Sequence, residues 1–271
     1  MEKCVTVVTV CRNAEKTIKN AIESVLKQTS DDFEYLIIDG NSLDKTYDIV
    51  LSYDRNFKSR GICYRHISEN DNGIWDAMNK GINLALGRWI IFINADDKLH
   101  DENVLKKVFG IDDIDKYDVV YGDTLRVSLT DKHIGKAMPI NMMTLNMPFC
   151  HQGSFTKREI MKRYMFDTDY RVADYNFFLS LYLDKGKFLQ IDEIIADYSM
   201  EGYSNQNKYK TFLGTVQVRH DHGLINMKSW KQKIKNIYFR ELLIEESLLH
   251  GIIIWIDSKF SRRGKREDVH T

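Results

Sequence analysis

The chain has 271 residues, of which 43% are hydrophobic and 29% are charged, as in an ordinary soluble globular protein. Its 39 basic residues balance 39 acidic ones, so the overall charge gives no reason to expect nucleic acid as a partner. The four cysteines form no CxxC pair, and no stretch resembles a signal peptide or reaches the length of a transmembrane helix. These features argue against a disulfide framework and predict a cytoplasmic protein.

Strand and helix patterns alternate along the first hundred residues. Apolar, β-branched runs predict buried strands, and apolar residues at helical spacing predict the helices between them. The strands are expected at residues 5–10, 35–38, 63–67 and 89–93, and the helices at 18–26 (with Asn13 as the cap), 46–53 and 74–85. This order implies a parallel sheet with helices on both faces, and ligands of such sheets bind where the strands end.

The remaining sequence is less regular. Strands are expected at residues 119–122 and 188–191, a hairpin segment at 124–129, a loop at 138–150, and helices at 157–163, 174–184, 208–220 and 229–259. The last helix contains the apolar run 251–256, and a basic tail follows it. This segment predicts either a packed helix with a solvated tail or a helix that lies on an anionic membrane surface.

Carboxylates gather where two of the predicted strands end. Asp39 follows one apolar strand, and Asp96 and Asp97 follow another. Clustered carboxylates repel one another unless a cation lies among them, and Mg²⁺ or Mn²⁺ suits such oxygen-rich sites. The alternative for residues 94–97 is a polar turn that caps the next helix. Spacing alone leaves both interpretations open.

Five strings together resemble the bacterial family 2 glycosyltransferases with a GT-A fold, closest to the non-processive enzymes of exopolysaccharide, lipopolysaccharide and capsule assembly. They are VTVVTVCRN, LIIDGNSLDKT, SENDNGIWDAMNKGINLALGRWIIFINADD, FCHQGSFTKR and YRVADYNFFLSLYLDKGKF. The resemblance implies an α/β fold with a mostly parallel sheet and flanking helices. It also implies a GT-A domain at 1–205, with a nucleotide-sugar-binding half (1–98) and an acceptor half (99–205), followed by a helical extension at 206–271.

The resemblance also implies which residues bind the nucleotide of the donor. Asp39 is similar to the aspartate that hydrogen-bonds the base, which is uracil in most of these enzymes; the alternative is a turn at residues 39–40. Asn94 stands where many members carry an aspartate. The nucleotide-binding residues implied are Thr9, Cys11, Asn13, Asp39, Asp71, Lys80, Asn94, Ala95 and Asp96.

Metal binding and catalysis are implied at three further places. Asp96 is expected to ligate the metal, and Asp97 either to ligate it directly or to support its ligands. His151 is expected to ligate the metal, to bind a phosphate or to be a buried structural residue. Asp174 is similar to the family's catalytic aspartate, and its alternative is a plain helix cap. The cleft for donor sugar and acceptor is expected to involve Asp123, His151 and Gln152.

The resemblance predicts an inverting transfer of sugar from a nucleoside diphosphate sugar to a glycan or lipid-linked acceptor in cell-surface polysaccharide synthesis. Mn²⁺ or Mg²⁺ is the expected cofactor, and the inner face of the cell membrane is a place where such an enzyme could act. The QxxRW element of processive members is absent from the sequence. Two alternatives are a sugar-nucleotide pyrophosphorylase, which residues 11–16 disfavour because they lack glycine, and a non-catalytic binding domain, which the retained aspartates disfavour.

Overall fold

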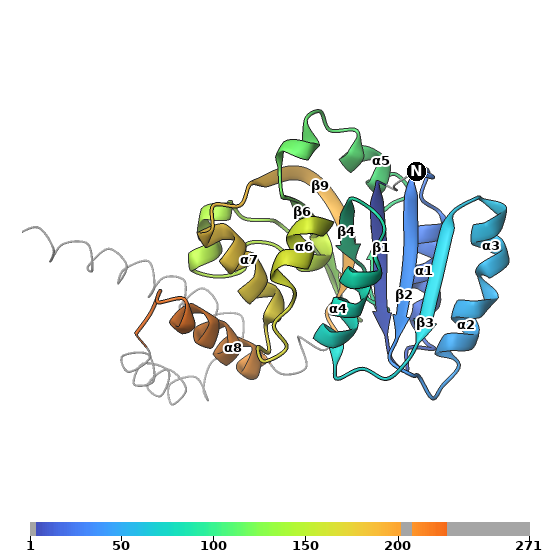
Figure 1. Ribbon diagram of the computed structural model, residues 1–271, viewed down its shortest axis with the longest axis horizontal. Coiled ribbons are helices and arrows are strands. Elements are labelled where there is room, and N and C mark those ends of the chain that lie inside the picture. Colours follow the sequence, from blue (N-terminus) through green and yellow to red (C-terminus); the bar gives the residue numbers. More distant parts are fainter. Residues whose placement is uncertain (1–3, 202–207, 227–271) are drawn as a thin grey trace, which may run out of the picture.

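The structure is a computed structural model that describes residues 4–201 and 208–226 (Figure 1). Its strands form one mixed sheet in the order β3-β2-β1-β4-β8-β6-β9-β5, and β7 pairs with β6 beside this path. The strands are β1 (Val5–Cys11), β2 (Phe33–Asp39), β3 (Cys63–Ser68), β4 (Trp89–Phe92), β5 (Lys98–Leu99), β6 (Val119–Val127), β7 (Lys132–Gly135), β8 (Ser154–Lys157) and β9 (Phe188–Ser199).

Helices cover both faces of this sheet. They are α1 (Ile18–Leu26), α2 (Thr46–Ser52), α3 (Asp54–Ser59), α4 (Ile74–Leu84), α5 (Val104–Phe109), α6 (Arg158–Tyr164), α7 (Ala173–Leu183) and α8 (Lys208–Asp221), with short 3₁₀ helices at Ile114–Lys116, Ile140–Thr144 and His151–Gly153. One apolar core joins α1, α2, α3 and α5 to the sheet, and a second core joins α4, α6, α7 and α8 to its other face. Neighbouring strand residues such as Val7 and Val8 therefore point into different cores.

The first four strands, β3-β2-β1-β4, are parallel, as the sequence predicts. Both faces of β1 and β2 are covered, which explains why every residue of these two strands is buried. The pairing aligns Cys11 with Asp39 and Asp39 with Ser68. The carboxyl ends of three strands therefore lie at one level, and this edge positions the candidate site.

The second half contains elements that the sequence patterns did not predict. β8 is antiparallel and lies between β4 and β6, so it joins the parallel part of the sheet to the rest. β5, α3 and α5 were also not predicted, and β9 continues to Ser199 instead of ending near residue 191. Each unpredicted element has six residues or fewer, which is too short for a hydrophobic period to show clearly.

The described C-terminal part is the predicted helix α8, which packs beside α7 (Figure 1). Val218 of α8 is fully buried in the same apolar core as the aromatic side chains of α7. The helix expected at residues 229–259 lies outside the described residues. Within residues 4–201 and 208–226, no helix combines the length and the apolar character needed to cross a membrane.

Candidate active site

Asp39, at the end of β2, is fully buried and holds several loops together. Its Oδ1 accepts hydrogen bonds from the Ser42 hydroxyl at 2.5 Å and from the Cys11 thiol at 3.6 Å. Its Oδ2 accepts from the Ser42 backbone N–H at 3.0 Å and from the Ser68 hydroxyl at 2.5 Å. Four donors therefore occupy both oxygens, so the expected contact with a nucleobase requires one of the serines to give way.

Thr9 and Cys11 of β1 lie inside the same end of the sheet. The Thr9 hydroxyl donates to the Ile93 carbonyl oxygen at 2.7 Å and lies 3.0 Å from the Tyr35 hydroxyl. No part of Thr9 is exposed, and its hydroxyl fixes β1 to the start of the acidic turn, so its expected contact with the nucleotide stays a prediction. Burial, together with the charge of Asp39, raises the pKa of the Cys11 thiol far above its usual value. Cys11 is therefore a neutral donor to Asp39.

Asn13 links two loops at the carboxyl edge and does not cap a helix. Its side-chain oxygen accepts from the Leu43 backbone N–H at 2.8 Å, and its own backbone N–H donates to the Ser42 hydroxyl at 2.8 Å. Its φ of 51° lies in the left-handed region, which asparagine tolerates better than most residues. The prediction that Asn13 caps the first helix is wrong, because α1 begins at Ile18.

Asp97 is the buried member of the acidic turn, residues 94–97, that follows β4. Its Oδ1 accepts from the Ser199 backbone N–H at 2.9 Å, and its Oδ2 accepts from Gln152 Nε2 at 2.9 Å. Burial, reinforced by the charge of Asp96, raises the pKa of Asp97 to about 7. Asp97 therefore anchors the turn to β9 and to Gln152, which favours the indirect one of its two expected roles at the metal.

Asp96 and Asn94 are the other two polar side chains of the acidic turn. The Asp96 side chain reaches solvent, yet the surrounding protein desolvates its carboxyl and raises its pKa, while a positive charge on His151 lowers it. Asn94 Oδ1 is buried and has no hydrogen-bond partner among the described residues. Ala95 is buried between them and offers only its backbone.

The 3₁₀ helix His151–Gly153 connects the acidic turn to the predicted catalytic base. Gln152 holds Asp97, and the Cys150 thiol donates to Gln152 Oε1 at 2.7 Å, which fixes the orientation of the amide. His151 Nδ1 lies 3.2 Å from Asp174 Oδ2 and donates to it when the proton is on Nδ1. Two consecutive residues thus join the acidic turn to Asp174.

Asp174 lies in the first turn of α7, with 22% of its side chain exposed. Its Oδ1 accepts from the Tyr175 backbone N–H at 2.9 Å, and the N-terminus of a helix favours the charged form of a carboxylate. His151 Nε2 is buried and has no hydrogen-bond partner in the described part of the chain. Residues 4–201 and 208–226 contain no group of three or more His, Cys, Asp or Glu residues placed to hold a metal ion.

A cleft of about 630 Å³ opens at the end of β1, between the start of α4 and residues 168–171. Cys11 and Asp71 line it as expected, whereas Asp96 and Asp174 are outside its lining. Trp75 connects the two regions, because it lines the cleft and its ring meets the His151 ring edge-on, with centroids 6.4 Å apart. Arg12 also lines the cleft and follows β1 directly, where the strand-end rule predicts ligand binding. Trp75, Tyr170 and Arg171 line it as well and were not among the expected site residues.

The loop before α4 forms part of this cleft. Asp71 Oδ1 accepts from the Gly73 backbone N–H at 2.9 Å, and Gly73 has a φ of 113°, which L side chains rarely adopt. Lys80, expected to bind the nucleotide, pairs with Glu69 at 2.9 Å and donates to the Asn70 carbonyl oxygen at 2.6 Å. Lys80 therefore braces the loop that carries Asp71.

Asp123 of β6, which we expected in the cleft for donor sugar and acceptor, is engaged by protein groups. Its Oδ1 accepts from the Ala137 backbone N–H at 2.8 Å, and its Oδ2 pairs with Lys136 at 2.6 Å. The side chain is 6% exposed. Asp123 thus fixes the segment that follows β7, and its carboxylate is not open to a sugar.

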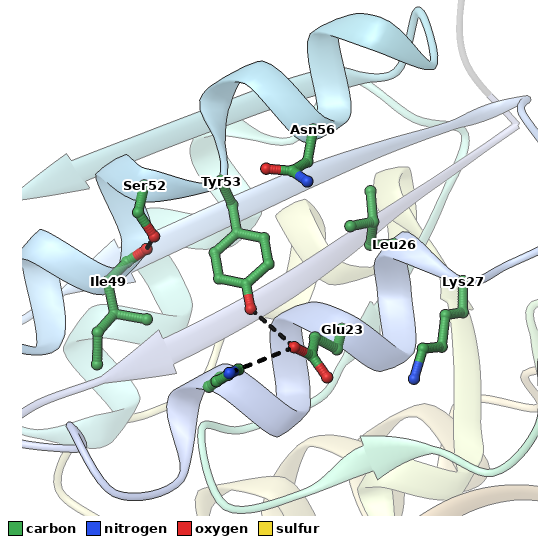
Figure 2. Close-up of a pocket in the computed structure, with 8 residues that line it drawn as sticks. Glu23, Leu26, Lys27, Ile49, Ser52, Tyr53 and Asn56 are labelled. Carbon is green, nitrogen blue, oxygen red and sulfur yellow. Dashed lines mark hydrogen bonds and ion pairs between the residues drawn. The ribbon is translucent and has the colours of Figure 1, made fainter.

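A second cleft, of about 640 Å³, lies between α1 and the α2–α3 pair (Figure 2). Figure 2 shows Glu23 at its centre, where Oε1 accepts from the Tyr53 hydroxyl at 3.0 Å and pairs with Lys19 at 3.8 Å. None of the expected site residues lines this cleft. The cleft at the end of β1 is therefore the one that belongs to the candidate site.

A parallel sheet, an acidic turn after β4 and a separate carboxylate at a helix start define the class of GT-A glycosyltransferases. Residues 6–183 match the family model for glycosyl transferase family 2. The chain belongs to this family and is a glycosyltransferase. Membership leaves no support for the pyrophosphorylase and the non-catalytic alternatives.

Known proteins similar to the chain come from several organisms. A PGL/p-HBAD biosynthesis glycosyltransferase of Mycobacterium bovis is 31% identical over 208 residues, covering 74% of the chain and 79% of that protein. The solved structure of S. aureus TarS 1–349 with UDP-GlcNAc has a TM-score of 0.64 at 18% identity, covering 79% of the chain and 65% of TarS 1–349. The solved structure of a Pyrobaculum calidifontis mannosyltransferase with GDP-Man and Mn²⁺ has a TM-score of 0.60 at 15% identity, covering 77% of the chain and 60% of the mannosyltransferase.

Proposed function

We propose that the chain transfers a sugar from a nucleoside diphosphate sugar to a hydroxyl group of a glycan or lipid-linked acceptor, with inversion at the anomeric carbon. The observation that carries this proposal is the rigid link between two acidic centres. Gln152 holds Asp97 of the acidic turn, and the adjacent His151 holds Asp174. The acidic turn can therefore hold the metal ion that binds the leaving diphosphate, while Asp174 accepts the proton of the attacking hydroxyl.

Asp174 acts as the general base in this proposal. It has to be charged to accept the proton of the acceptor hydroxyl, and its place at the start of α7 favours the charge. The hydrogen bond from His151 Nδ1 occupies one side of Oδ2 and limits how the carboxylate can turn. Because a single displacement needs the base opposite the leaving group, a fixed carboxylate favours a single inverting step.

The residues present fit a divalent metal ion that arrives with the substrate, either Mn²⁺ or Mg²⁺. The exposed Asp96 carboxylate and Asn94 Oδ1, which has no hydrogen-bond partner among the described residues, offer oxygen ligands, while Asp97 is engaged by Ser199 and Gln152. Mg²⁺ is commonly held by one or two carboxylates together with substrate phosphates. When bound, the ion stabilises the negative charge of the leaving diphosphate. Asp96 would ligate it, and Asp97 would hold the turn in place.

The donor and the acceptor follow from the relatives and from the cleft. The similar structures bind UDP-GlcNAc and GDP-Man, which supports a nucleotide sugar as donor, and we favour a uracil base. The cleft combines Trp75 and Tyr170 with Arg12 and Arg171, residue types that stack on rings and pair with phosphates. The similarity to a PGL/p-HBAD biosynthesis glycosyltransferase supports a role in making a glycan or glycolipid. We propose that the enzyme acts in the cytoplasm at the inner face of the membrane.

Calorimetric titration of UDP with and without Mn²⁺ tests this proposal. We expect UDP to bind more tightly with Mn²⁺, and we expect Asp96→Ala to abolish this difference. Asp115→Ala is the matched control, because Asp115 is an exposed aspartate whose partner is Arg88, remote from the turn. If UDP does not bind, titrations of GDP and dTDP show whether the donor carries a different base. Failure of all three nucleotides to bind the wild-type protein would refute the proposal.

A further inference from the structure

Helix α8 lies beyond residues 6–183, the part of the chain that matches the family model. It nevertheless contacts residues on both sides of Asp174. The Tyr170 hydroxyl donates to Asp221 Oδ2 at 2.9 Å, and His222 Nε2 lies 2.9 Å from Asn176 Oδ1. The residues four before and two after the proposed base are therefore both tied to the end of α8.

The backbone of α8 also approaches this segment closely. A Cβ atom added at Gly214 would lie 3.3 Å from Val172 Cγ2 and 3.5 Å from Arg171 Cβ. Val216 and Val218 are 3% and 0% exposed, so α8 is seated in the core. The segment that leads into α7 thus rests against the surface of α8.

The other side of the same segment rests on α4. Asn79 donates to the Phe166 carbonyl oxygen at 2.7 Å and accepts from the Phe166 backbone N–H at 2.8 Å. Trp75 Nε1 donates to the Arg171 carbonyl oxygen at 3.3 Å. Residues 166–172 therefore lie between α4 and α8, and residues 168–171 form one wall of the cleft.

We propose that α8 positions this cleft wall and Asp174, with Tyr170–Asp221 and Asn176–His222 as the positioning pairs. The inference extends the proposed function, since it takes Asp174 as the base. Loss of either pair frees the chain on one side of Asp174 while α7 stays folded around its aromatic core. A displacement of about 1 Å at a reacting group lowers turnover up to about 100-fold. The role is one of positioning, because the Tyr170 hydroxyl is bonded to Asp221, and only the Tyr170 ring is proposed to meet the donor.

The test uses variants of the full chain that break or preserve the Tyr170–Asp221 bond. Tyr170→Phe keeps the ring in the cleft wall and removes only the hydroxyl, and Asp221→Ala removes the acceptor. Asp221→Asn keeps an acceptor oxygen for Tyr170. Gln217→Ala is the control, because it removes a different donor to Asp221, Gln217 Nε2, which lies 2.8 Å from Oδ1 and 2.9 Å from Oδ2, and keeps both Tyr170 and Asp221.

Two measurements are made on each variant. Hydrogen–deuterium exchange compares amides of residues 168–176 with those of β1 and β2, and steady-state kinetics with a panel of UDP-sugars separates kcat from KM. We expect Tyr170→Phe and Asp221→Ala to speed exchange only at 168–176 and to lower kcat about 10-fold, the equivalent of one hydrogen bond. Calorimetric binding of UDP is expected to stay within about two-fold, and Asp221→Asn and Gln217→Ala are expected to behave like the wild type.

Unchanged exchange at 168–176 in both link-breaking variants would overturn the inference. The inference would also be overturned if the link-breaking variants exchanged faster throughout the sheet and Asp221→Asn did so as well. In that case α8 would act only on global stability. Absence of turnover by the wild type with every donor contradicts the proposed function. The exchange measurement still decides the role of α8 in that case.

Discussion

Replacing His151 with asparagine or glutamine separates the roles of its two ring nitrogens. The amide of asparagine reaches about as far as Nδ1, whereas the amide of glutamine reaches about as far as Nε2. His151→Asn therefore keeps a donor for Asp174, and His151→Gln places its amide where Nε2 was. If His151 acts through Asp174, the asparagine variant is the active one. If it acts through Nε2 on a metal ion or a phosphate, the glutamine variant is the active one.

The expected magnitude follows from the contact between His151 and Asp174. Their 3.2 Å hydrogen bond joins side chains that are 11% and 22% exposed, and bonds to charged groups contribute about 1.5–3 kcal/mol. Each 1.36 kcal/mol changes a rate about ten-fold. We expect His151→Gln to lower kcat about 10- to 100-fold and His151→Asn to lower it less than about 3-fold.

The assay follows release of the nucleoside diphosphate with the donor that the titrations select. Mn²⁺ affinity is measured on the same proteins by calorimetry in the presence of UDP, and we expect both variants to retain it. Circular dichroism and the melting temperature serve as the folding control. Near-wild-type turnover by His151→Gln, together with a large loss in His151→Asn and weaker Mn²⁺ binding, would refute the positioning role.

Three further predictions concern stability. Because burial raises the pKa of Asp97 to about 7, ionisation of Asp97 destabilises the metal-free fold as pH rises from 4 toward 7, by a few kcal/mol at most. In EDTA, we expect the melting temperature of the wild type to be lower at pH 8 than at pH 5, and we expect a smaller decrease for Asp97→Asn. An equal decrease in both proteins would contradict this prediction. Gly87→Ala, whose Cβ would lie 2.5 Å from the Thr6 backbone nitrogen, should destabilise by about 1–3 kcal/mol in urea titrations. Asn79→Ala, which leaves both backbone groups of Phe166 without their partner, should lower the unfolding free energy by about 1–3 kcal/mol, whereas replacing exposed Asn72 should change it little.

The parallel half of the fold could be predicted from the sequence because its strands are buried on both faces. Val5–Cys11 and Phe33–Asp39 consist mainly of apolar and β-branched residues, with helical patterns between them, and such runs are typical of a parallel sheet covered on both faces. β8 has only four residues, of which Phe155 is the one large apolar side chain. Its place between β4 and β6 depends on pairing with residues distant in the chain, which a local pattern does not contain.

The site was predictable by region and less so by side chain. The strand-end rule and the family resemblance led to Asp39, Asp97 and Asp123, and the structure shows that protein donors engage both oxygens of each of these carboxylates. Residue type reveals that a carboxylate is present but not how many donors surround it. Asp96 differs because its side chain reaches solvent, although the surrounding protein partly desolvates its carboxyl group.

This distribution of contacts separates the carboxylates that build the site from those that can meet a ligand. A carboxylate whose two oxygens both accept from protein donors is stabilised in one orientation, and turning it toward a ligand breaks bonds already formed. Asp39 and Asp97 are of this kind and fix the strand ends and the acidic turn. Asp96 and Asp174 retain exposed carboxylate surface, and the His151–Gln152 pair sets the geometry between them. Substitutions at Asp39 or Asp97 should therefore perturb stability along with activity, whereas Asp174→Asn should lower kcat at least 100-fold with an unchanged melting temperature.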